Sequence, residues 1–202
     1  MIMPGFNSQQ LREWLATLSK EKQLAFGAAC CERLVPNYVL FQQDSGFGDV
    51  RPVRDALDLI WSFLEGRQVS ENDINEATLA CESAAPNSDI STSLFVTAAQ
   101  DACFAICCLL DYLHEKNVDK IVQVATYATD SVDLYVQEVE HLPPNDLQLE
   151  EKILAHPLMQ RELVQQRIDL GAIEQASQLN HQFFSHLKAL WKNDGRGNLD
   201  LP

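Results

Sequence analysis

The chain has 202 residues, of which 46% are hydrophobic, and its formal net charge is −14. This length supports one sizeable hydrophobic core and does not require a second domain. Nucleic acids and anionic membranes are bound mainly through Lys and Arg, so the excess of acid predicts no nucleic acid partner and no membrane partner.

The N-terminal part of the chain is predicted to be helical. Apolar residues recur there every three or four positions, and strict two-residue alternation is absent. We expect helices over residues 8–18 and 20–34. Because proline disfavours helix at the residue before it, Pro36 is expected to end the second helix, and a short helical piece follows at 38–43.

Helix-start signals mark the next two elements. Glycines on either side of Phe47 break the periodic pattern, and Asp49 is predicted to cap a helix over 49–65. Ser70 and Asp73 form the sequence pattern of a capping box, so they predict the start of a further helix. The next proline in the chain is expected to end that helix.

The C-terminal half predicts the longest elements. Two helices over 91–115 and 118–141 are joined so tightly that they should pack as antiparallel neighbours. A short helix is expected at 146–155. Pro157 can begin a final helix of about 35 residues, which is long for a globular domain, and residues 193–202 are expected to form a loose tail.

These elements predict an all-α fold. We expect a compact single-domain bundle over residues 1–202, with about seven to nine helices, two long central antiparallel helices and a long C-terminal helix. The most apolar run, residues 102–110, is too short to span a bilayer. The first residues carry no secretion signal of the usual kind, so we expect a cytoplasmic location.

No residue pattern assembles a recognisable catalytic or metal centre. The six cysteines lie in apolar helical patterns without a Cys-x-x-Cys pair, which predicts buried thiols. Glu138 and His141 form one Glu-x-x-His motif, but a di-iron bundle needs a second copy. Nucleophile elbows and phosphate-binding loops are also missing from the sequence. We therefore expect no metal, no cofactor and no enzyme of a recognisable class.

Polar, aromatic and glycine residues gather between two predicted helices, and Asp101 lies on a mostly apolar helix. This gathering defines a candidate binding site that consists of Glu32, Arg33, Asn37, Tyr38, Phe47, Asp49 and Asp101. The same residues have a structural interpretation, in which Asp49 caps a helix and Arg33 or Arg54 neutralises Asp101.

The residues that carry a family resemblance lie over 26–61 and at 101–103. They are Cys31-Glu32-Arg33, Pro36-Asn37-Tyr38, Phe41, Gln43, Gly46-Phe47-Gly48-Asp49, Leu57-Asp58-Leu59-Ile60-Trp61 and Asp101-Ala102-Cys103. In these motifs the chain resembles the YjaG-like bacterial family, domain of unknown function 416. The resemblance implies a small all-helical bacterial cytoplasmic protein. It implies no activity, cofactor or catalytic residue.

Two functions are compatible with these features. Long acidic intervals, residues 68–115 and 121–151, contain no Lys or Arg and favour a protein-interaction or regulatory bundle with a basic protein partner. The alternative is an enzyme or small-molecule-binding protein with a pocket near Arg33, Tyr38, Asp49 and Asp101. A homodimer through the C-terminal helix is also expected, because that helix is rich in large apolar residues: Phe183, Phe184, Leu187, Leu190 and Trp191.

Overall fold

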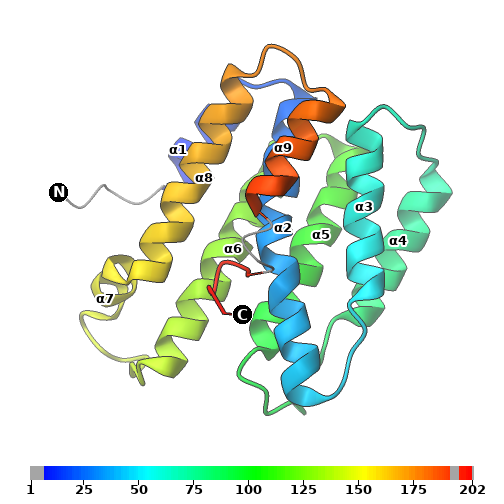
Figure 1. Ribbon diagram of the computed structural model, residues 1–202. Helices are drawn as coiled ribbons and strands as arrows, with labels where there is room; N and C mark the ends of the chain where they lie inside the picture. The colour runs from blue at the N-terminus through cyan, green and yellow to red at the C-terminus, as the bar shows by residue number, and fades with distance from the viewer. Residues whose placement is uncertain (1–6, 192–195, 202) are drawn as a thin grey trace.

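The computed structural model describes residues 7–191 and 196–201, without the side chains of 189–191. Within these ranges the chain forms nine α-helices and no strand (Figure 1). This confirms the predicted all-α fold. In chain order the helices are α1 (Ser8–Ala16), α2 (Lys20–Ser45), α3 (Arg51–Leu64), α4 (Glu71–Ala84), α5 (Val96–Glu115), α6 (Val118–Val139), α7 (Leu149–Ala155), α8 (Pro157–Gln175) and α9 (His181–Trp191).

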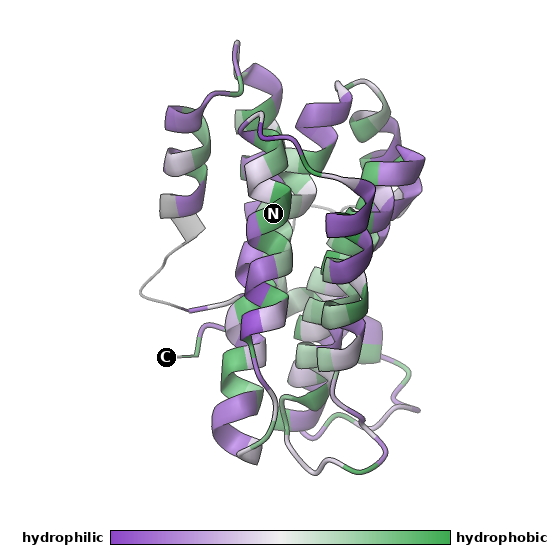
Figure 2. Ribbon diagram, turned by 90° about the vertical axis from the view of Figure 1, so that its right-hand side faces the viewer, coloured by the Kyte–Doolittle hydropathy of each residue, from purple (hydrophilic) through white to green (hydrophobic). Residues whose placement is uncertain are grey.

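Helices α2, α5 and α6 form the centre of the bundle. A two-residue link, Lys116 and Asn117, returns α6 beside α5 as the predicted antiparallel pair, and α2 packs against both helices. Gly27 permits the close approach of α2, because a Cβ there would lie 2.5 Å from Leu109 Cδ2 and 3.3 Å from Ile121 Cδ1. Apolar residues line the interior and hydrophilic residues face outward (Figure 2).

Helix α5 is the most apolar element of the bundle. Among the described residues it is the one helix whose length and composition would suit a membrane span, and 72% of that apolar window is buried within the bundle. It contacts α2, α3, α4 and α6. A helix that is apolar on most sides is expected at the centre of a globular fold.

Helix α2 continues through Pro36, so the predicted helix end there and the separate piece at 38–43 are wrong. Proline removes one backbone N–H and restricts Val35. The helix persists because α2 is surrounded by other helices that bury most of its middle turns, Val35 included, and tertiary burial overrides local propensity. Gly46, with φ of 70°, forms the C-cap.

The predicted single helix over 157–192 is two helices, α8 and α9, so the expected long C-terminal helix is wrong. The chain turns after α8, where Ala176 takes an extended conformation, and not at Gly171. Asn180 then restarts a helix, because its side-chain Oδ1 accepts a hydrogen bond from the backbone N–H of Phe183 at 2.9 Å. Asparagine is a strong helix-starting residue, and this capping signal outweighs the apolar periodicity.

Helix α9 lies against α2, which bears on the predicted homodimer. Phe184 and Leu187 are 0% and 1% exposed, so this chain already covers two of the five apolar side chains that motivated the dimer. Phe183 is partly buried, and the side chains of Leu190 and Trp191 lie outside the described residues. Dimerisation therefore stays a prediction.

The C-terminal end is not loose where the structure describes it. Of the predicted tail over 193–202, residues 196–201 are described, and Asn198 and Leu199 are each only 2% exposed. A buried amide and a buried leucine hold this end against the bundle, which corrects the expectation of a loose tail for residues 196–201. Residues 193–195 and 202 lie outside the described residues.

Candidate functional site

Arg33 of α2 is buried and joins α2 to α8. Its Nε and Nη2 donate to the two carboxylate oxygens of Glu162 at 2.9 and 2.7 Å, and its Nη1 donates to Asp169 at 2.6 Å. Glu162 and Asp169 are 2% and 1% exposed. Burial raises the pKa of Asp169 to about 6, although Arg33 opposes this shift. We therefore assign Arg33 to holding two helices together.

Glu32 of α2 connects this helix to α3 through side-chain hydrogen bonds. Its carboxylate accepts hydrogen bonds from Arg54 Nη1 at 2.7 Å and Nη2 at 3.0 Å, and from Trp61 Nε1 at 2.7 Å. Arg54 also donates to Asp58 at 2.8 Å. The predicted site residue Glu32 thus serves helix packing.

Asp101 pairs with neither arginine, so the prediction of a partner at Arg33 or Arg54 is wrong. Both arginines bind other carboxylates, and Asp101 Oδ2 instead accepts a hydrogen bond from the Ser131 hydroxyl at 3.0 Å. Asp101 is 9% exposed. Burial raises the pKa of Asp101 to about 7, Ser131 lowers it and Asp130 adds to the rise.

Asn37 and Tyr38 face different surroundings although they are adjacent in α2. Asn37 is fully buried, and its Nδ2 donates to Asn198 Oδ1 at 2.8 Å. The Tyr38 hydroxyl donates to the carbonyl oxygen of Ala84 at 2.7 Å, which ties α2 to the end of α4. These two side chains also serve packing.

Phe47 and Asp49 lie at the surface beyond the end of α2. Phe47 is 77% exposed beside a cavity of about 710 Å³, whose lining mixes small polar residues with apolar residues and one acid, Asp44, and favours no single ligand class. Asp49 and Tyr38 line an adjoining cavity of about 460 Å³. As predicted, Asp49 accepts a first-turn amide, from Arg51 at 3.0 Å, although Val50 is the N-cap. The seven predicted site residues therefore do not converge on one opening.

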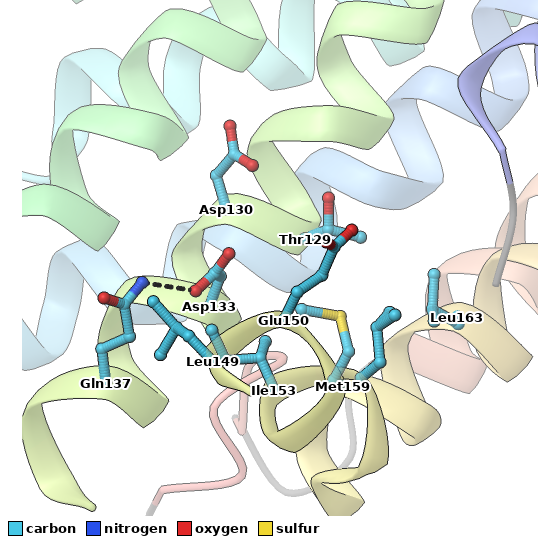
Figure 3. A pocket seen from close by; sticks show the side chains of 10 residues that line it. Thr129, Asp130, Asp133, Gln137, Leu149, Glu150, Ile153, Met159 and Leu163 are labelled. Carbon is cyan, nitrogen blue, oxygen red and sulfur yellow. Dashed lines mark hydrogen bonds between the residues drawn. The ribbon is translucent and has the colours of Figure 1, made fainter. Parts of the chain in front are cut away.

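A third cavity, of about 370 Å³, opens between α6, α7 and α8 (Figure 3), and we call it the acidic pocket. Its polar lining comes from Asp130 and Asp133 of α6, with Thr129 and Gln137, and from Glu150 of α7. Positions three to four apart share one helix face, so α6 presents its polar residues together. The rest of the lining is apolar and comes from α7 and α8: Leu149, Ile153, Leu154, Met159 and Leu163.

The acidic pocket concentrates negative charge over an apolar floor. In Figure 3 the three carboxylates stand above Ile153 and Met159. Gln137 Nε2 donates to Asp133 at 2.7 Å and holds its carboxylate in place. Burial raises the pKa of Asp130, and the neighbouring charge of Asp133 raises it further. The lining includes no Lys or Arg, so the carboxylates favour a cation from outside the pocket.

The carboxylates of the acidic pocket do not form a metal centre. Across the described part of the chain, no group of three or more His, Cys, Asp or Glu could hold a metal ion.

The cysteines match the prediction of buried thiols. Five are buried and Cys107 is partly buried, and all six are free. Burial raises the pKa of Cys30 to about 12 and that of Cys108 to about 11. A raised pKa disfavours the thiolate, which is the reactive form, so these thiols are suited to packing.

The acidic pocket lay outside the candidate site predicted from the sequence. Its carboxylates belong to the acidic interval 121–151, which was identified from the sequence, whereas its apolar floor comes from α7 and α8. The available signal was the apolar spacing of Leu149 and Ile153 around Glu150, beside the acids of α6. Only the packing of α7 against α6 and α8 brings the two sets together.

Comparisons with known proteins agree with the fold. The chain is 25% identical over 187 residues to the uncharacterised protein YjaG of Escherichia coli (strain K12), covering 93% of each chain. It is 27% identical over 128 residues to an uncharacterised protein of Haemophilus influenzae, covering 61% of this chain and 63% of that one. The crystal structure of a DUF416 family protein from Shewanella baltica OS155 superposes with a TM-score of 0.86 at 26% identity, covering 98% of this chain and 99% of that one. Residues 10–201 match the family model described as "Protein of unknown function (DUF416)", so the chain belongs to the DUF416 family.

Proposed function

We propose that the protein binds a basic segment of a partner protein at the acidic pocket. The observation that carries the proposal is the lining, in which Asp130, Asp133 and Glu150 surround an apolar floor without a Lys or Arg. Lys and Arg side chains combine an apolar stem with a charged head, and they bury the stem while the head stays near carboxylates. The pocket offers matching surfaces for both parts.

The surrounding surface favours a partner longer than a small amine. Seven acids and no Lys or Arg lie between Lys120 and Lys152. Glu138, Glu140 and Glu151 from this interval are exposed near the pocket, at the end of α6 and on α7. An extended field of one sign attracts an oppositely charged segment and raises the rate of encounter. We therefore favour a basic peptide segment and a role in protein interaction or regulation.

A labelled peptide tests this proposal. The probe is a short fluorescein-labelled peptide of Lys-Lys-Leu-Leu repeats, and binding is followed by fluorescence anisotropy. The double variant Asp130→Asn/Asp133→Asn should bind about tenfold more weakly, which corresponds to about 1.4 kcal/mol. The control Glu76→Gln/Glu82→Gln changes the net charge equally on α4, on the other side of the bundle in Figure 1, and should bind as the natural chain does.

Two further probes separate the possible ligands. A Lys-Lys-Ser-Ser peptide keeps the charge and lacks the apolar side chains, so it should bind more weakly than the leucine peptide if the apolar floor contributes. Spermidine should compete poorly, because it has no apolar side chain to occupy the floor. Equal losses in the two double variants would contradict the proposal, since that result indicates attraction to overall charge alone.

A further inference from the structure

The C-terminal end docks against the bundle through specific contacts. Asn198 donates from its backbone N–H to the Arg33 carbonyl oxygen at 3.1 Å and from Nδ2 to the Ala128 carbonyl oxygen at 2.7 Å, while its Oδ1 accepts from Asn37 at 2.8 Å. Only glycine fits at position 197, because a Cβ would lie 2.6 Å from the Arg33 carbonyl oxygen and 2.7 Å from Asn37 Oδ1. The segment 197–201 is therefore held by contacts that require glycine at position 197 and asparagine at position 198.

Ionic and apolar contacts complete the docking. Arg161 of α8 lies 2.6 Å from the Asp200 carboxylate and donates to the Gly197 carbonyl oxygen at 3.1 Å. Leu199 is 2% exposed, and Leu201 packs partly buried beside it. In Figure 1 the end of the chain crosses in front of α6 and α2. It thus connects α2, α6 and α8.

The docked leucine belongs to the same apolar cluster as the floor of the acidic pocket. Leu199 shares this cluster with Ile153, Met159 and Leu163, all of which line the pocket. Helix α7 has seven residues, and its main contacts are with α6 and α8. A helix this short has little stability of its own, so α7 depends on the cluster to which Leu199 belongs.

We propose that the segment 197–201 is a latch that sets the shape of the acidic pocket. When the latch is docked, Leu199 supports the floor and holds α7 in place, so the carboxylates and the apolar floor are preorganised for a ligand. When it is released, the cluster loses one of its walls and α7 loosens. Latch docking and ligand binding are therefore coupled. The ligand part rests on the proposed function, whereas the effect on α7 does not.

Variants of the latch test this coupling in the full-length chain. Gly197→Ala and, independently, Leu199→Asp should release the segment, seen as faster hydrogen exchange of the Asn198 amide. Both should speed exchange in α7 and weaken binding of the Lys-Lys-Leu-Leu peptide about tenfold, within the range of allosteric couplings. Gly171→Ala is the matched control, because its Cβ would have no neighbour within 4 Å, and it should change neither property.

The outcomes distinguish the latch from the proposed function. Released variants with unchanged exchange in α7 and unchanged peptide affinity would overturn the latch. If the natural chain does not bind the peptide, the proposed function fails, and exchange in α7 alone decides the latch. If both variants leave the Asn198 amide protected, the contacts of Gly197 and Leu199 do not hold the segment, and the latch is again contradicted.

Discussion

Arg33 of α2 and Glu162 of α8 meet through two hydrogen bonds of 2.9 and 2.7 Å, although they lie 129 positions apart in the sequence. Both residues are buried, and Asp169 adds a second carboxylate to the same guanidinium. Removing one partner of a buried ion pair leaves an uncompensated charge in a poorly solvated place. Arg33→Met should therefore lower the free energy of unfolding by about 3–5 kcal/mol, measured by urea denaturation.

A surface pair provides the control for this prediction. Arg12 and Asp119 approach as closely as Arg33 and Asp169, at 2.6 Å, but their side chains are 48% and 52% exposed. Exposed ion pairs contribute about 0–1 kcal/mol, so Arg12→Ala should have a small effect. If Arg33→Met and Arg12→Ala lower the free energy of unfolding by the same amount, the buried ion pair of Arg33 does not stabilise the packing of α2 against α8.

Asp101 should make stability depend on pH. Its pKa of about 7 in the folded chain exceeds the ordinary value for aspartate, so its contribution to stability is present at low pH and is lost as pH rises through about 7. Asp101→Asn cannot ionise. The free energy of unfolding of the Asp101→Asn variant should therefore be about 1–3 kcal/mol higher than that of the natural chain at about pH 8. At about pH 4 the difference should be much smaller.

Urea denaturation at both pH values measures this difference. Asp89→Asn is the control, because Asp89 is exposed in the loop between α4 and α5. It should leave the pH dependence unchanged. An Asp101→Asn chain that follows the natural chain at both pH values would show that Asp101 is not desolvated in the folded state.

Two glycines in helices should respond in opposite directions to alanine. At Gly27 the added methyl would lie 2.5 Å from Leu109 Cδ2, and overpacking of a core costs about 1–3 kcal/mol. At Gly171 the methyl would meet nothing within 4 Å, so Gly171→Ala should stabilise by about 0.5–1 kcal/mol through helix propensity. Thermal unfolding of both variants checks the signs. Stabilisation by Gly27→Ala would contradict the close packing of α2 on α5.

Local signals in the sequence predicted most of the fold. Ser70 and Asp73 form the expected capping box, since each side chain accepts the other's backbone N–H. The two helix errors, at Pro36 and after α8, have different physical origins. Burial of α2 overrides a proline whose effect is local, and the Asn180 cap restarts a helix that apolar periodicity alone extends without a break.

The site was less predictable, because it depends on contacts between distant segments. The carboxylates that bind Arg33 lie on α8, and periodicity does not indicate which helix will face α2. Asp130 and Asp133 were visible as part of an acidic interval. Their pairing with Met159 and the other floor residues depends on how α7 and α8 pack against α6, which local propensity does not fix.

The floor residue Met159 offers the most direct measurement of where a basic segment binds. It is 4% exposed and lines the acidic pocket, and the chain has only three methionines. Methionine labelled with ¹³C at the methyl group should give few NMR signals, and Met159→Leu assigns the relevant one. Titration with the Lys-Lys-Leu-Leu peptide should shift the Met159 methyl signal with the same affinity as the anisotropy measurement, and Asp130→Asn/Asp133→Asn should weaken that shift about tenfold. A peptide that binds by anisotropy while the Met159 signal stays in place would contradict binding at the acidic pocket.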